Sequence, residues 1–204
     1  VTVGRNYFQK KFNINDLKIR QASGIEANDK DQKKTAIEIP GCNDTEKEML
    51  LRFLLGKVPE KGIALKPSIR KLIMGCLFFI IIPVAVYFSL AYTFQDYIIF
   101  VPVYVLFIGL MQYFGFRHSR LFVNDDFIVK QSGAWDIDRD YIAPEKIQTI
   151  SVTQYFWHKR SDIGYVTLHT AGGTISFGLA DYTRLKQMVN YWLYQVEAGT
   201  TSWM

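Results

Sequence analysis

The sequence contains few cysteines and no recognisable set of metal ligands. Only Cys42 and Cys76 occur among the 204 residues, and they lie too far apart to pair, one in a polar segment and one in an apolar run. A disulfide framework is therefore excluded, as is usual in a reducing compartment. His118, His158 and His169 show no metal-ligand spacing with the cysteines.

Catalytic signatures are also lacking. The sequence has no Gly-x-Ser-x-Gly elbow, no phosphate-binding glycine loop and no nucleotide fingerprint. The acidic series Asp136, Asp138 and Asp140 lacks the Gly and the closing Glu of a calcium loop, and alternate acids on a strand usually form its solvated face. We therefore expect a protein that is not an enzyme and holds no cofactor or metal. No nucleic-acid motif accompanies the basic charge, so no nucleic-acid partner is expected.

Two long runs, Leu72–Phe94 and Tyr97–Phe116, contain no Lys, Arg, Asp or Glu, and only Gln95 and Asp96 separate them. Each run is long enough to cross the ~30 Å hydrocarbon core of a bilayer as a helix. The pattern predicts a transmembrane helical hairpin. The alternative is a helix pair buried in a soluble core, but such helices almost always keep a polar stripe.

Basic residues at both ends of the hairpin predict its orientation. Arg70 and Lys71 precede the first run, and Arg117 and Arg120 follow the second. Residues 1–71 contain 15 Lys and Arg against 9 Asp and Glu. Because basic residues near helix ends stay on the cytoplasmic side, both flanks are expected there. The uncharged spans argue against an ion pathway inside the hairpin.

The two flanks resemble one another. Residues 1–24 and 150–173 align without a gap at an offset of 149, pairing for example Lys10 with Lys159. Asn15 and Gly164 correspond, and we expect a tight turn with positive φ there. After an insertion at about 25–34, both copies continue with a strand, Ala36–Ile39 or Thr174–Phe177, and then a helix from Asn43-Asp44 or Asp181. A shared supersecondary unit explains this register. The first copy lacks its initial strands, and we expect the chain to be a fragment of a longer protein.

The second copy is predicted to be complete. Its expected strands are Leu121–Asn124, Phe127–Gln131, Trp135–Tyr141, Ile147–Thr153, Tyr165–Thr170 and the strand at 174–177. The helix after Asp181 places Leu185, Met188, Val189, Trp192, Leu193 and Val196 on one face. The predicted fold is an antiparallel β-barrel or orthogonal sandwich capped by a C-terminal helix.

The order of these features is similar to that of a known family. The residues concerned are Gly133, Pro144, Ile147-Gln148, Arg160, Gly164 and Ala171-Gly172-Gly173. Together with the adjacent hairpin, they resemble the bacterial pleckstrin-homology (PH)-like, membrane-flanked domain. The resemblance implies a PH-like barrel of seven strands with a C-terminal helix, in tandem copies separated by membrane hairpins, on the cytoplasmic face of a bacterial inner membrane.

The expected organisation follows from the repeat and the resemblance. Residues 1–57 are the C-terminal half of a first PH-like domain, 58–71 a basic linker, 72–116 the transmembrane hairpin, 117–197 a complete PH-like domain and 198–204 a tail.

An aromatic–basic segment is the candidate interaction surface. Its residues are Tyr155, Trp157, His158, Lys159 and Arg160, echoed in the first copy by Lys10 and Lys11. Aromatic rings followed by cations suit a boundary with lipid headgroups. The alternative is that Phe156 or Trp157 fills the barrel core.

These features predict a non-catalytic, multi-pass protein of a bacterial inner membrane. It would present PH-like modules on the cytoplasmic face to bind a protein partner, assemble a complex or form a homo-oligomer. One alternative is recognition of anionic lipid headgroups in the bilayer. Another is a subunit of a transport or channel assembly, which would need further helices or oligomerisation.

Overall fold

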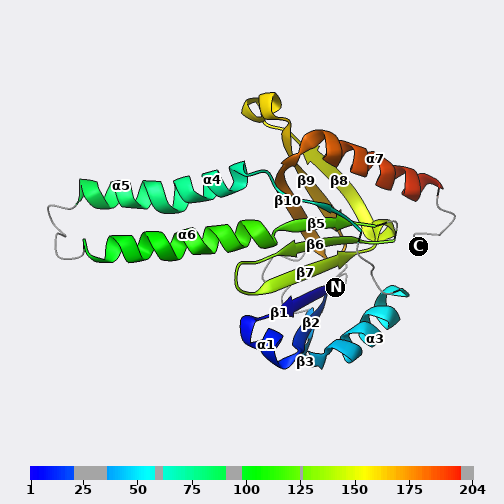
Figure 1. Cartoon of the computed structure of the whole chain (residues 1–204). Coiled ribbons are helices and arrows are strands. Elements are labelled where there is room, and N and C mark those ends of the chain that lie inside the picture. The colour runs from blue at the N-terminus through cyan, green and yellow to red at the C-terminus, as the bar shows by residue number, and fades with distance from the viewer. Residues whose placement is uncertain (21–35, 58–61, 91–97, 125, 199–204) are drawn as a thin grey trace.

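The computed structural model describes residues 1–20, 36–57, 62–90, 98–124 and 126–198, and folds them into two antiparallel sheets and a projecting helical hairpin (Figure 1). The larger sheet has the order β3-β2-β1-β7-β6-β5-β4, and the smaller has the order β10-β9-β8. The strands are β1 Thr2–Arg5, β2 Ile14–Arg20, β3 Ala36–Asn43, β4 Ile63–Leu65, β5 Arg120–Val123, β6 Ile128–Ser132, β7 Ile137–Ile142, β8 Ile147–Thr153, β9 Ile163–Thr170 and β10 Gly173–Asp181.

Strands β4–β7 and β8–β10 form a module whose two sheets enclose one apolar core. The 3-10 turn η3, Pro144–Lys146, leads the chain from β7 of one sheet to β8 of the other. Helix α7, Tyr182–Ala198, closes the core with Leu185, Val189 and Trp192, all buried. Asp181 caps this helix, because its Oδ1 accepts from the N–H of Arg184 at 3.0 Å. We call β4–β10 with α7 the complete module.

One residue of the α7 prediction differs from the structure, and a second is not tested by it. Leu193, expected on the buried face, is exposed, whereas its neighbour Trp192 is fully buried. The side chain of Val196 lies outside the described residues.

Strand β4 lies inside the segment expected to be a basic linker. Ile63, Ala64 and Leu65 pair with Val123, Phe122 and Leu121 of β5, and Leu65 joins the core. The prediction of a linker is therefore wrong at 63–65, where the structure has a strand. Because β4 and β5 are neighbours in the sheet, the hairpin at 70–118 is an insertion between two strands of one module.

The repeated unit recurs in the structure, as the sequence predicts. Strand β1, α1 (Tyr7–Phe12), β2, β3 and α3 (Asp44–Leu55) correspond in order to β8, η4 (Phe156–Ser161), β9, β10 and α7. We call the first set the half module. Its β1 pairs with β7 over Thr2–Arg5 and Ile137–Asp140, so the sheet of the complete module continues into it.

The positive-φ turn falls at a different pair of residues from the one predicted. Asn13 has φ 54° and Asp162 has φ 47°, and these two are also 149 positions apart. Asn15 and Gly164 instead lie buried within β2 and β9. A Cβ at Gly164 would meet Tyr182 Cδ2 at 2.5 Å, so close packing explains the glycine.

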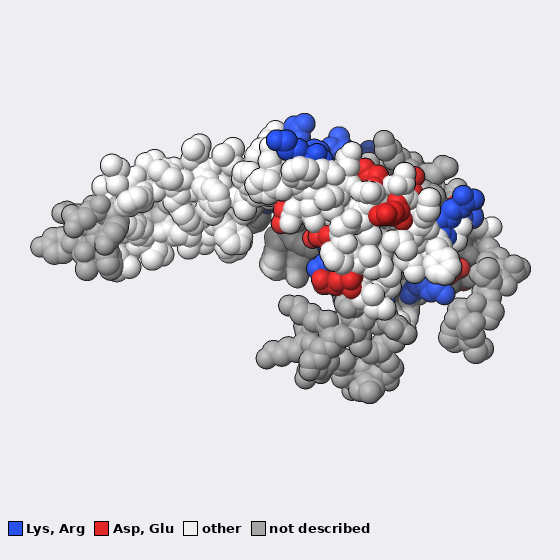
Figure 2. All heavy atoms as spheres, turned by 90° about the horizontal axis from the view of Figure 1, so that it is seen from below, with Lys and Arg blue, Asp and Glu red and all other residues white. Residues whose placement is uncertain are grey.

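The helical hairpin consists of α4 (Arg70–Cys76), the π-turn η1 (Leu77–Ile81), α5 (Ile82–Ser89) and α6 (Phe100–His118). Both arms are long and apolar enough to cross a membrane, at 20 and 19 residues, and neither is buried in the chain. Figure 2 shows the described part of the hairpin without charged side chains, and Lys and Arg gather where it joins the modules. The turn Gln95-Asp96 lies outside the described residues.

A proline leaves one backbone carbonyl of the first arm free for a hydrogen bond from the second arm. Pro83 has no N–H, so it removes the α-helical donor to the carbonyl of Phe79. The Tyr104 hydroxyl of α6 donates to that carbonyl at 2.7 Å. The π-turn η1 precedes the proline, as is common where a helix is locally rearranged.

Hydrogen bonds fix the base of the hairpin to the complete module. Lys71 Nζ donates to Ser119 Oγ at 2.7 Å, which joins the two arms. Gln131 Nε2 of β6 donates to the carbonyl of His118 at 3.1 Å, and His118 Nδ1 lies 3.1 Å from the carbonyl oxygen of Ala134. The module therefore has a defined orientation relative to the hairpin.

Candidate interaction surface at the base of the hairpin

The aromatic–basic segment of the complete module forms the short helix η4, which projects from the β8–β9 connection. Tyr155 and Trp157 stack at 5.1 Å between ring centroids, and Phe156 meets Trp157 edge to face at 4.4 Å. Phe156 is 76% exposed, and Trp157 is also exposed, so neither ring fills the core. His158 is the buried member of the segment. Lys159 and Arg160 are exposed beside the rings.

The half module builds a similar projection from α1. Tyr7, Phe8 and Phe12 are all exposed, Phe8 at 74%, and Lys10 and Lys11 are exposed on the same short helix. Arg5 Nη2 braces the turn by donating to Asn13 Oδ1 at 2.9 Å. Exposed aromatic rings beside cations are thus a shared property of both copies. We call these two segments the two aromatic turns: one is η4 together with Tyr155, and the other is α1.

Both aromatic turns lie at the level where the hairpin leaves the sheets. In Figure 1, η4 is on one side of the hairpin base and α1 on the other, while the end of α7 and most of α3 lie farther from the hairpin. Lys10 and Lys11 are thus brought to the same end of the molecule as Lys159 and Arg160, on opposite sides of the hairpin.

The predicted flanking cations lie between these turns. Arg70 and Arg117 are exposed at the ends of α4 and α6, and Arg117 Nη1 donates to the Tyr113 hydroxyl at 3.4 Å. Lys71 is partly buried and bonded to Ser119, and Arg120 begins β5. The base of the hairpin therefore combines apolar helix, exposed aromatic rings and cations.

Trp135 belongs to this surface, although the sequence placed it in a strand. It lies in the turn between β6 and β7, contacts Met111 Sδ of α6 and lies 6.2 Å from the Phe114 ring centroid. The alternation along residues 135–141 indicated a half-buried strand face and contained no signal for contact with the hairpin.

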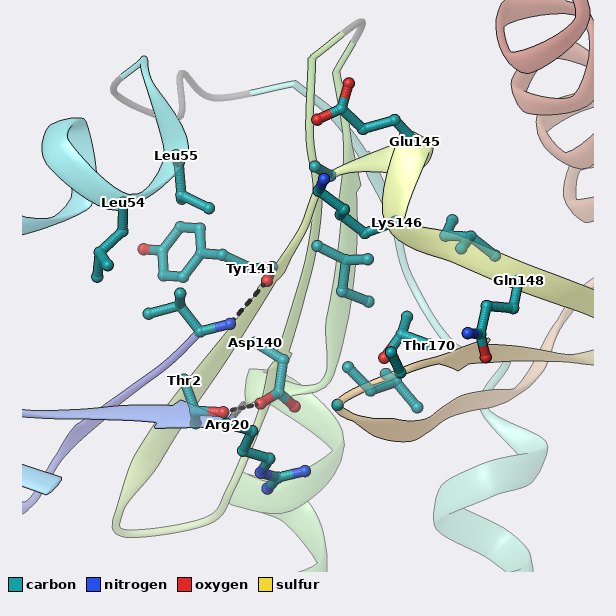
Figure 3. Close-up of a pocket in the computed structure, with 17 residues that line it drawn as sticks. Thr2, Arg20, Leu54, Leu55, Asp140, Tyr141, Glu145, Lys146, Gln148 and Thr170 are labelled. Carbon is teal, nitrogen blue, oxygen red and sulfur yellow. Dashed lines mark hydrogen bonds between the residues drawn. The ribbon is translucent and has the colours of Figure 1, made fainter. Parts of the chain in front are cut away.

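A second region, a cavity of about 790 Å³, lies at the seam of the two modules, away from the hairpin (Figure 3). It adjoins the end of β7, where Thr2 Oγ1 donates to Asp140 Oδ1 at 2.6 Å. Arg20 and Lys146 contribute positive charge there, and Asp140 and Glu145 contribute negative charge. The lining of this cavity thus carries charges of both signs.

The described residues hold no group of three or more His, Cys, Asp or Glu that is arranged to bind a metal ion. The burial of Asp138, with Asp140 nearby, raises the pKa of the Asp138 carboxyl. The Asp44 carboxyl has a lowered pKa, because Lys47 and Asn15 donate hydrogen bonds to it. Each shift follows from the local surroundings of its carboxyl group.

The two antiparallel sheets with a C-terminal helix fit a PH-like fold. The family model described as "Bacterial PH domain" matches residues 50–196, which is well over half of the chain. The chain therefore belongs to the bacterial PH domain family, as the sequence resemblance predicted. The match spans the hairpin and both sheets of the complete module. No curated protein and no solved structure matches the chain.

Proposed function

We propose that this protein is a non-catalytic, membrane-anchored binding module of a bacterial inner membrane, which holds its two PH-like units against the cytoplasmic leaflet and contacts anionic lipid headgroups through the two aromatic turns. The observation that carries the proposal is the position of these turns, level with the base of the hairpin and on both sides of it.

The length and exposure of the hairpin support membrane anchoring. Its arms of 20 and 19 residues extend about 30 Å at ~1.5 Å per residue, which matches the hydrocarbon core. Neither arm is buried in the chain, so the alternative of a soluble core helix pair lacks support. An exposed apolar surface of this size requires lipid or protein cover. Arg70 and Arg117 at its base favour a cytoplasmic location for the modules.

The chemistry of the aromatic turns supports headgroup contact. Aromatic side chains with a polar edge, such as Trp157 and Tyr7, are enriched at membrane–water interfaces. Lys10, Lys11, Lys159 and Arg160 are exposed beside them. Each basic residue near an anionic leaflet contributes about 1 kcal/mol of attraction. Because the hairpin fixes the distance of both turns from the bilayer, little entropy is lost when they touch it.

A fluorescence experiment on the full chain tests the proposal. Phe156→Cys is labelled with an environment-sensitive dye in a background in which Cys42 and Cys76 are alanine. The protein is reconstituted in phosphatidylcholine vesicles with or without phosphatidylglycerol. We expect blue-shifted emission that is strongest with the anionic lipid and is reduced by Lys159→Glu with Arg160→Glu. The matched control, Lys146→Glu with Lys186→Glu, alters exposed cations elsewhere. Water-like emission in both membranes would refute the proposal.

Self-assembly through α3 is a second candidate. Met49 and Phe53 of α3 are exposed, Phe53 at 86%, and the half module encloses a much smaller core than the complete one. An exposed apolar helix face of this kind suits a second copy of the chain. The mass of the particle in detergent should then fall to that of one chain in Met49→Ser with Phe53→Ser. A monomeric wild-type protein would exclude this candidate.

A further inference from the structure

A pocket at the base of the hairpin has the composition of an anion site. Its volume is about 350 Å³, and it lies between the half module and the end of α6. Arg5, Lys10, Lys47 and Arg139 contribute four cations to its lining, and within the described residues no Asp or Glu lines it. The seam cavity of Figure 3, by contrast, has acids as well as bases.

The alternation of side-chain directions along β7 explains why cations but no acids of this strand line the pocket. Residues two apart on a strand share a face, so Ile137, Arg139 and Tyr141 of β7 line the pocket together. Trp135 of the preceding turn lines it as well. The acids Asp136, Asp138 and Asp140 alternate with them and do not line it. The sequence pattern that suggested a solvated acidic face therefore also supplies the aromatic and basic wall of the pocket.

The cationic side chains of the pocket have hydrogen-bonding capacity or charge left for a ligand. Arg5 Nη2 donates to Asn13 Oδ1, but its buried Nε has no hydrogen-bond partner. Arg139 Nε donates to Gln131 Oε1 at 3.1 Å, which orients the guanidinium. Lys10 is exposed at the edge of the pocket. Lys47 is paired with Asp44 at 2.7 Å, so it contributes less charge than the other three.

The pocket adjoins the part of α6 that would lie in the headgroup layer. Phe114 and His118 of α6 line it, and Trp135 contacts Phe114. These two α6 residues are separated by ~6 Å along the helix axis, which is comparable to the thickness of one headgroup layer. A lipid with its acyl chains along α6 would therefore place its phosphate beside these cations.

We propose that this pocket binds the phosphate of one anionic phospholipid whose acyl chains lie against α6. The proposal rests on the membrane insertion proposed above, but it concerns a different set of residues from the two aromatic turns apart from Tyr7 and Lys10 of α1. Arg139 and Arg5 would donate to the phosphate oxygens, and the ring of Trp135 would lie against the glycerol region. Charge-assisted hydrogen bonds to phosphate are stronger than neutral ones.

Native mass spectrometry of the full chain released from detergent tests the site. The probes are phosphatidylglycerol, phosphatidylcholine and inorganic phosphate. We expect one retained phosphatidylglycerol per chain, in preference to phosphatidylcholine, and about a tenfold loss of retention in Arg139→Gln and in Lys10→Gln. Lys10 is exposed, so its variant preserves the fold, and melting curves check both variants. Lys159→Glu with Arg160→Glu is the control and should retain the lipid.

Two results would overturn the proposal. Equal retention in the wild type, Arg139→Gln and Lys10→Gln would show that the pocket does not hold the lipid. Displacement of phosphatidylglycerol by inorganic phosphate at a similar concentration would assign the site to a free anion. The dye on residue 156 separates the two proposals. Blue-shifted emission without a retained lipid would refute the lipid site in the pocket and leave the proposed function standing. Water-like emission would refute membrane contact by the aromatic turn.

Discussion

The complete module and the half module contain the same run of elements but differ in their cores. In the complete module, two sheets and α7 enclose twelve buried apolar residues. In the half module, one sheet and α3 enclose Val3, Leu17 and Leu51 as the fully buried cluster among the described residues. The local sequence thus determines the strand–turn–strand–strand–helix order, while the larger core forms where a second sheet faces the first. The half module instead extends the neighbouring sheet through β7.

The largest expected effect concerns corresponding residues of the two capping helices. Trp192 and Leu54 occupy the eleventh position after Asp181 and Asn43, but Trp192 is 0% exposed and Leu54 is 37% exposed. Trp192→Ala should lower the free energy of unfolding by about 3–5 kcal/mol, because it leaves a cavity in the core. Leu54→Ala should cost less than ~1 kcal/mol. Denaturant unfolding of the full chain in detergent measures both. Equal losses would show that the modules are equally packed.

Removing a core side chain of the half module should affect that module first. Leu17→Ala deletes a fully buried side chain, at a cost of about 2–4 kcal/mol. Because the half module has few other buried residues, hydrogen exchange should rise over β1–β3 and stay unchanged over β8–β10. Val166→Ala, at the corresponding position of β9, is the matched variant and should reverse the pattern. Faster exchange in both modules with either variant would mean that they unfold as one unit.

The two modules use different residues at the corresponding contact between a strand and the start of the capping helix. Gly164 leaves room for the Tyr182 ring at the start of α7, whereas Asn15 donates to Asp44 Oδ1 at 2.9 Å at the start of α3. Gly164→Ala should cost about 1–3 kcal/mol, because its Cβ would meet Tyr182 Cδ2 at 2.5 Å. Tyr182→Ala should relieve this clash in the double variant. Thermal melting measures the coupling, and additive losses would contradict the explanation.

The smallest effects concern two carboxylates with opposite pKa shifts. Burial raises the pKa of Asp138, so its contribution to stability is present below the unfolded pKa and is lost as the pH rises through the folded pKa. Hydrogen bonds from Lys47 and Asn15 lower the pKa of Asp44, so its contribution is lost as the pH falls through the folded pKa.

Asp138→Asn and Asp44→Asn should therefore change the pH dependence of melting in opposite senses. Both changes should stay below about 1 kcal/mol, since both side chains keep contact with water, which screens their interactions. Melting curves between pH 3 and pH 7, as a range around the ordinary carboxyl pKa of about 4, measure them. Changes of the same sign would contradict the assigned causes.

Local patterns in the sequence predicted most elements of the fold. Strand β8 has the predicted bounds, and the other expected strands of the complete module agree within a few residues at most ends. Strand β10 is longer than predicted, because a bulge at Leu179, with φ 56°, lets it continue past Gly178. Helix caps at Asn43 and Asp181 were recognisable because a polar residue preceded an amphipathic run.

Contacts between distant segments could not be predicted from these patterns. Strand β4 has only three residues, and its partner β5 follows the whole hairpin, so no local pattern identifies the pair. Pairing of β1 with β7 likewise joins residues more than 130 positions apart. The pocket at the base of the hairpin could not be predicted for the same reason, since the pairing of β1 with β7 brings Arg5 and Arg139 together.

The position of both aromatic turns relative to the bilayer tests the account most directly. Dye labels are placed singly at Phe8, Phe156 and Phe53 of the full chain in anionic vesicles, and a quencher attached to lipid headgroups is added. Phe53 is exposed on α3, a helix that lies mostly farther from the hairpin base in Figure 1, and it serves as the reference. We expect strong quenching at residues 8 and 156 and weak quenching at 53. Equal quenching at all three positions would contradict the account.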